Sequence, residues 1–123
     1  KKKFAFIAPA VSGDEAARDE FFESLKKEEN REQESWVIEA LGYLHSPLRQ
    51  KSSEKYILPS LEMLEEIKAT GDIFFPAGWI TTTLQGHQSE TAKETVINFL
   101  KSHPAYPENL KLKILQAGDQ LMR

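Results

Sequence analysis

The three histidines, His45, His87 and His103, are the side chains best suited to metal binding or proton transfer near neutral pH. Each lies beside an expected helix break, and no His-Glu-x-x-His pattern occurs. Glu90 is close to His87 in sequence, but an expected turn at 86–89 divides the two, and a zinc site needs further ligands. We therefore expect three separate histidines that cap helix ends or face solvent, and no metal site on this chain.

Other catalytic chemistry is equally poorly represented. The sequence has no cysteine, which excludes thiol catalysis, thiolate metal ligands and disulfides. It also has no Gly-x-Ser-x-Gly motif and no glycine-rich phosphate loop. Glu65 and Glu66 are adjacent, so on a helix they point to different sides and cannot share a proton. The sequence predicts no catalytic residue, and an autonomous hydrolase is the least favoured function.

Two stretches have a composition that suits recognition. Residues 43–49 place polar groups at the end of an expected helix, and residues 71–79 form an expected loop rich in aromatic side chains. Such a loop can fill the gap between stacked helix pairs, which is the favoured interpretation, or it can present a binding surface.

The elements that position these stretches are expected to be helices. Apolar residues recur at helical spacing, while hairpin signals and sustained alternation are absent. Ser12 and Glu15 have the spacing of a capping box, and Pro59 must start or kink its helix. The expected helices number about six and cover roughly 12–25, 36–45, 52–70, 76–84, 89–103 and 107–121.

A weak internal repeat suggests how these helices are arranged. Trp36-Val37-x-x-x-Leu41 returns 43 residues later as Trp79-Ile80-x-x-x-Leu84, and a longer amphipathic segment follows each copy. A helix pair at this spacing is typical of HEAT repeats. We therefore predict an all-α fold of antiparallel helix pairs in a HEAT-like α-α superhelix, with a compact helical bundle as the alternative.

Composition and charge limit the class of protein. With 123 residues, 40% hydrophobic and 28% charged, the chain has the size and balance of one soluble globular domain. The net charge of −3 argues against a nucleic-acid partner, and no apolar run is long enough to span a membrane. The lack of cysteine leaves cytoplasm and periplasm both open as compartments.

The ends of the sequence lead to a further expectation. The chain starts at Lys1 without an initiator Met and stops at Arg123, so we expect residues 1–123 to be one helical domain excised from a larger protein. A domain cut from a helical array should expose apolar side chains where earlier helices packed. That surface is expected around four residues: Phe4, Phe6, Ile7 and Val11.

Four stretches of the sequence resemble a known family. They are Trp36-Val37-Ile38-Glu39-Ala40-Leu41-Gly42-Tyr43-Leu44-His45-Ser46-Pro47-Leu48-Arg49, Tyr56-Ile57-Leu58-Pro59-Ser60-Leu61-Glu62, Gly71-Asp72-Ile73-Phe74-Phe75-Pro76 and Leu112-Lys113-Ile114-Leu115-Gln116-Ala117-Gly118-Asp119. Together they are similar to the C-terminal helical region of bacterial zinc aminopeptidases of the aminopeptidase N family. The resemblance runs from about Arg18 to the end of the sequence.

The resemblance implies a parent gluzincin peptidase with an N-terminal β domain, a thermolysin-like catalytic domain and this HEAT-like helical domain. Its zinc would be held by two His and a Glu in the catalytic domain. Neither the zinc signature nor the Gly-x-Met-Glu-Asn exopeptidase motif is present here, so the family's catalytic residues cannot be placed on this sequence.

The resemblance further implies that this domain closes over the catalytic cleft and limits peptide access. Its partners would be the catalytic domain of the same chain and peptide substrates. Arg49 is the candidate for substrate contact, because a guanidinium suits the C-terminal carboxylate of a peptide. The favoured alternative for Arg49 is a helix cap or surface ion pair. The alternative function is a stand-alone α-solenoid module for protein–protein interaction.

Overall fold

The structure is a computed structural model that describes residues 2–46, 50–85 and 87–122. These three stretches contain helices, turns and loops but no strand, which confirms the all-α prediction. Two elements are 3₁₀ helices, η1 (Glu28–Arg31) and η3 (Glu54–Tyr56). The α-helical segments are α1 (Lys2–Val11), α2 (Glu15–Ser24), α3 (Glu34–Leu44), α4 (Gln50–Ser53), α5 (Ile57–Glu62), α6 (Leu64–Thr70), α7 (Phe75–Leu84), α8 (Glu90–Ser102), α9 (Glu108–Ala117) and α10 (Asp119–Met122).

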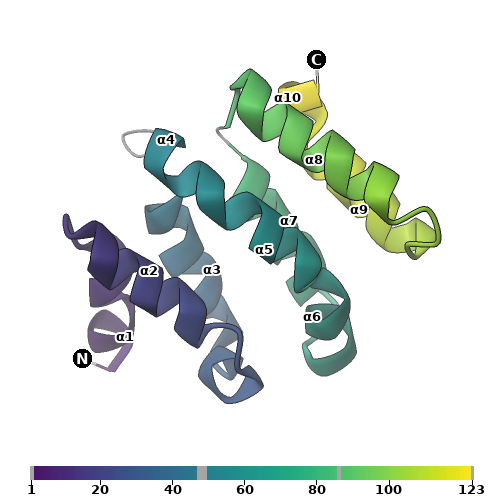
Figure 1. Ribbon diagram of the computed structural model, residues 1–123. Coiled ribbons are helices and arrows are strands. Elements are labelled where there is room, and N and C mark those ends of the chain that lie inside the picture. Colours follow the sequence, from purple (N-terminus) through teal and green to yellow (C-terminus); the bar gives the residue numbers. More distant parts are fainter. Residues whose placement is uncertain (1, 47–49, 86, 123) are drawn as a thin grey trace.

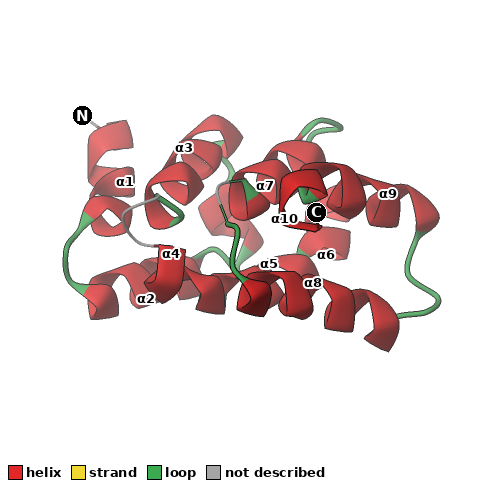
Figure 2. Cartoon of the chain, turned by 90° about the horizontal axis from the view of Figure 1, so that it is seen from above, coloured by secondary structure: helices red, strands yellow, loops and turns green. Residues whose placement is uncertain are grey.

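The helices lie in two rows. The first row runs α1, α3, α7, α9, and each of these helices contacts the next. The second row holds α2, α5 and α8, of which α5 contacts α8. Figure 2 shows both rows from above, and Figure 1 shows α1 and α9 at opposite ends of the molecule. The chain therefore crosses between the rows repeatedly and adds a new helix pair beside the previous one.

The described helical segments exceed the expected six for two reasons. Residues 2–11, where no helix is expected, form α1, and short turns interrupt what the hydrophobic pattern reads as one helix. The segment expected at 52–70 is divided into α4, η3, α5 and α6. Met63, between α5 and α6, has φ −84° and ψ −9°, which is close enough to helical backbone to keep Leu61 and Leu64 on the buried side. Pro59 lies in the first turn of α5, where the missing N–H removes no helical hydrogen bond.

The helix ends show which capping predictions hold. Ser89 caps α8 by accepting a hydrogen bond from the Ala92 N–H at 3.0 Å, at the start of the helix expected over 89–103. The predicted Ser12 capping box is wrong, because Asp14 caps α2 by accepting from the Ala16 N–H at 3.0 Å. The Ser12 hydroxyl instead accepts from the Asp14 N–H, which orients the capping residue itself.

The core is continuous across both rows, and its centre is Trp79 of α7. The Trp79 side chain is fully buried and donates its indole N–H to the Ser60 carbonyl of α5 at 3.1 Å. Helices α7 and α3 approach closely at Gly78, where an added Cβ would lie 3.3 Å from Ile38 Cδ1. Helix α7 is therefore held from two sides, by α3 in its own row and by α5 in the other.

Helix α1 corrects the expectation of an exposed apolar end. Ile7 is buried, and Phe6 packs edge-on against Phe21 with ring centroids 5.4 Å apart. For these two residues the expectation is wrong, because the segment folds as a helix and places one face against α2 and α3. Two apolar side chains of α1 do remain exposed, since Phe4 is 73% and Val11 44% accessible.

No helix among the described residues is long and apolar enough to cross a membrane.

Candidate functional site

The substrate-contact candidate Arg49 lies outside the described residues, as do Pro47 and Leu48. Of the neighbouring residues that suit recognition, Tyr43 is exposed on α3, whereas His45 is buried at its C-terminal end. Among the described residues of this stretch, the structure thus separates a solvent-facing tyrosine from a buried histidine. The role of Arg49 stays a proposal.

A buried histidine pair joins two helices of the first row. His45 follows α3 and His87 follows α7, and His45 Nδ1 lies 2.8 Å from His87 Nε2. The two residues are only 3% and 2% exposed, and their rings meet edge to face with centroids 5.0 Å apart. The expectation of three separate, cap-like histidines is therefore wrong for these two, because α3 and α7 stack side by side and bring their C-terminal ends together.

The hydrogen bond between the rings constrains their protonation. One nitrogen must donate and the other must accept, so two imidazolium rings cannot share this geometry. Whichever tautomers are present, the remaining nitrogens, His45 Nε2 and His87 Nδ1, comprise one donor and one acceptor. Neither has a hydrogen-bond partner within the described part of the chain. The histidine pair is therefore polar and buried, and only two of its four ring nitrogens have a hydrogen-bond partner among the described residues.

The electrostatic surroundings favour a neutral pair. Burial, reinforced by repulsion from His87, lowers the pKa of His45 to about 3. Burial also lowers the pKa of His87, although the nearby Glu54 carboxylate opposes this shift. Tyr56 presents a ring to His45 with centroids 6.1 Å apart, so the pair has an aromatic rather than an ionic neighbour on that side.

His103 behaves as the sequence predicts. Its Nδ1–H donates to the Phe99 carbonyl at 2.8 Å, which caps the C-terminal end of α8, and its ring stacks on Phe99 with centroids 4.3 Å apart. His103 is therefore a structural cap.

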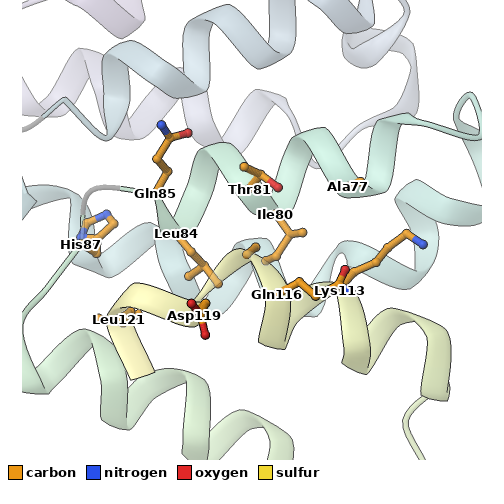
Figure 3. Close-up of a pocket in the computed structure, with 11 residues that line it drawn as sticks. Ala77, Ile80, Thr81, Leu84, Gln85, His87, Lys113, Gln116, Asp119 and Leu121 are labelled. Carbon is orange, nitrogen blue, oxygen red and sulfur yellow. The ribbon is translucent and has the colours of Figure 1, made fainter. Parts of the chain in front are cut away.

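A cavity of about 280 Å³ opens beside the histidine pair, between α7 and the α9–α10 segment. Figure 3 shows His87 at one end and Lys113 at the other, with Ile80 and Leu84 between them. Lys113 and Asp119 bring opposite charges to the lining. The cavity has room for a small molecule, but this balance favours neither an anion nor a cation.

The loop between α6 and α7 is shorter than the loop expected at 71–79, because α7 already begins at Phe75. Phe75 is buried and fills the gap between helices, whereas Ile73 and Phe74 are 80% and 79% exposed. Phe75 fits the gap-filling interpretation, whereas a binding role for the exposed Ile73 and Phe74 stays a proposal. The Asp72 N–H donates to Glu34 Oε2 and the Phe74 N–H to Asp72 Oδ1, each at 3.0 Å, so the backbone is held while the two apolar side chains face solvent.

The donor groups of the described residues do not fit the zinc centre that the resemblance implies for the parent enzyme. Within those residues, no group of three or more His, Cys, Asp or Glu side chains could hold a metal ion. The histidine pair supplies two nitrogens at hydrogen-bonding distance from each other, and no third ligand joins them. We therefore place no step of zinc chemistry on this chain.

The histidine pair was missed at the level of sequence, although a signal for it exists. His45 and His87 are 42 residues apart, almost the spacing of the Trp36–Trp79 repeat. Equivalent positions of adjacent repeats lie side by side in a stacked array, so a repeated histidine predicts a histidine pair.

Comparison with protein-family models, with curated proteins and with solved structures found no match.

Proposed function

We propose that this chain is the C-terminal helical domain of a zinc-dependent aminopeptidase, which closes the catalytic cleft and shapes peptide access without being catalytic itself. The observation that carries the proposal is the addition of helix pairs in two rows, in which each first-row helix contacts the next. This arrangement supports a HEAT-like α-α superhelix over a compact bundle, because α1 and α9 lie at opposite ends.

The resembling stretches support the same proposal by their position. They contribute to α3, to α5, to the loop before α7 and to α9, so they span both rows. Superhelices of this kind present extended, rigid faces and act by shape. A domain with such faces suits the control of peptide access in a parent enzyme whose chemistry resides elsewhere.

The experiment is a comparison of the complete gene product with residues 1–123 alone. We expect the complete protein to contain His-Glu-x-x-His with a downstream Glu, and to release N-terminal residues in a zinc-dependent way. The isolated domain should leave aminoacyl-amides intact with added zinc. A complete gene without the zinc signature would refute the proposal, and so would zinc-dependent turnover by the domain alone.

Arg49 gives a sharper test of substrate contact within the complete enzyme. If its guanidinium binds the C-terminal carboxylate of the substrate, Arg49→Met should raise KM for a free tripeptide by roughly 10–100-fold, the value of a charged hydrogen bond. KM for the same tripeptide with an amidated C-terminus should not change. Equal effects on both substrates would assign Arg49 to structure instead.

A second candidate is a stand-alone α-solenoid interaction module, which the exposed Ile73 and Phe74 favour. The two functions differ in what surrounds the domain. Absence of a peptidase domain from the complete gene, together with a separate protein bound at this loop, would favour the module.

A further inference from the structure

The α6–α7 loop presents apolar side chains from a fixed backbone. Besides the hydrogen bonds of Asp72 and Phe74, Gly71 is packed so closely that an added Cβ would lie 2.7 Å from Phe75 Cδ2 and 2.9 Å from the Ile67 carbonyl oxygen. Neighbouring Ile73 and Phe74 nevertheless expose about four-fifths of their surface. Binding through such a loop loses little conformational entropy, because the backbone is already held.

An acidic pocket of about 200 Å³ is lined by Gly71 and Phe75, the residues that flank this part of the loop. Its lining includes Glu28, Glu32 and Glu34, together with Arg31 and Gly71 from the loop. The Arg31 charge is already neutralised, because its guanidinium donates to Glu66 and to the Leu25 carbonyl, both at 2.7 Å. Within the described residues, Glu28 and Glu32 form no ion pair, so the pocket suits a cation.

The combination of an apolar protrusion and an acidic pocket discriminates among occupants. An anionic lipid surface would be repelled by Glu28 and Glu32. A second copy docked with this pocket on the twofold axis would oppose one acidic pocket to the other, which brings like charges together. A protein surface with an apolar recess beside a lysine or arginine matches both features, because Ile73 and Phe74 would fill the recess while the cation enters the pocket.

We propose that Ile73, Phe74 and the pocket lined by Glu28 and Glu32 form a docking site for the catalytic domain of the same polypeptide. The identity of this partner rests on the proposed function, whereas its chemistry rests on the geometry of the loop and pocket. The recognised surface carries an apolar recess with an adjacent basic side chain. The site fixes the position of the helical domain relative to the catalytic cleft.

The test is photo-crosslinking in the complete gene product. Phe74→p-benzoylphenylalanine should link, on irradiation, to a segment outside residues 1–123 of the same polypeptide that carries a lysine or arginine beside apolar residues. The matched control is Leu58→p-benzoylphenylalanine, since Leu58 is also apolar and 42% exposed but lies on α5. Mass spectrometry should find several-fold more interdomain product from position 74 than from position 58.

A second, independent experiment removes negative charge from the pocket. Glu28→Gln combined with Glu32→Gln should lower the crosslinking yield from position 74 several-fold, because the pocket loses its attraction for the cation. Glu94→Gln, at an exposed glutamate of α8, should leave the yield unchanged. An equal yield in all variants would overturn the role of the pocket. All five substituted residues are exposed, so the folded chain should tolerate them.

The remaining outcomes separate this inference from the proposed function. A product with lipid, with a second copy or with a separate protein would overturn the docking site, as would a yield no higher than the Leu58 control. If the zinc signature and activity are present but position 74 links to nothing, the docking inference alone fails. If position 74 links to another domain of a protein without a zinc signature, the proposed function fails and the docking chemistry stands.

Discussion

The two ends of α7 present opposite departures from the usual distribution of polar and apolar groups. Before the helix, Ile73 and Phe74 are apolar and exposed, and after it His87 is polar and buried against His45. The hydrogen bond between the histidines lowers the cost of burying them, since a buried polar group without a partner is costly. His45 Nε2 and His87 Nδ1 still have no partner among the described residues. The exposed pair has no equivalent internal partner. One end of α7 is therefore packed inside the fold with its polar groups only half paired, while the other end is suited to a second protein surface.

The largest expected effect comes from removing the residue that holds α7 itself. Trp79→Ala should lower the free energy of unfolding by about 3–5 kcal/mol, because it leaves a cavity in the core and an unpaired Ser60 carbonyl. Trp79→Phe should have a smaller effect, since it retains an aromatic ring. Urea denaturation measures both. A loss below about 1 kcal/mol for Trp79→Ala would show that α7 is not central to the stack.

The buried histidine pair after α7 should make the free energy of unfolding depend on pH. The folded pKa of His45, about 3, lies below its unfolded value of 6.5, so below pH 6.5 the unfolded chain binds more protons. The stabilisation is complete above pH 6.5 and is lost as pH falls toward 3. From pH 6.5 to roughly pH 5 the loss should be about 2 kcal/mol, since one pKa unit corresponds to about 1.4 kcal/mol.

Urea denaturation at several pH values measures this slope, and a variant without the pair is its control. His45→Phe combined with His87→Leu should flatten the pH dependence between roughly 6.5 and 5. The depressed pKa of Asp19, caused by hydrogen bonds from Lys55 and Tyr56, affects stability only at more acidic pH. An unchanged slope in the double variant would show that the histidines are not the titrating groups.

The backbone of the α6–α7 loop should not accommodate even a methyl group at position 71. Gly71→Ala should destabilise the chain by about 1–3 kcal/mol, because the new Cβ would contact the Ile67 carbonyl oxygen at 2.9 Å and Phe75 at 2.7 Å. Gly13→Ala is the matched control, since an added Cβ there meets nothing within 4 Å. Thermal unfolding of the two variants distinguishes them. Equal melting temperatures would mean that the loop is not held as the structure indicates.

The smallest effect is expected at the exposed side chains themselves. Phe74→Ser should change the free energy of unfolding by no more than about 0.5 kcal/mol, although it deletes an aromatic ring, because that ring is 79% exposed. Phe75→Ser, one residue further, should cost several times more, since Phe75 is buried. Chemical denaturation compares the two variants. Similar losses would contradict the division of this loop into a packed and a presented residue.

Several features could be predicted from local sequence because they depend on neighbouring residues. The helical class follows from apolar spacing, the start of α8 from the polar residues near 89, and the cap at the end of α8 from His103. Local patterns were less reliable where two short polar residues compete, as Ser12 and Asp14 do before α2. They also failed at Met63, where the apolar stripe continues through a turn.

The sequence by itself determined that the chain is helical and which residues of most helices face inward, because helical spacing places every third or fourth residue on one face. Only the tertiary structure decided that His45 meets His87 and that Phe75 is buried while Phe74 is not. These outcomes depend on which helices stack beside each other and on how far neighbouring helices are shifted along their axes. That information lies in packing between segments distant in sequence, and no local pattern contains it.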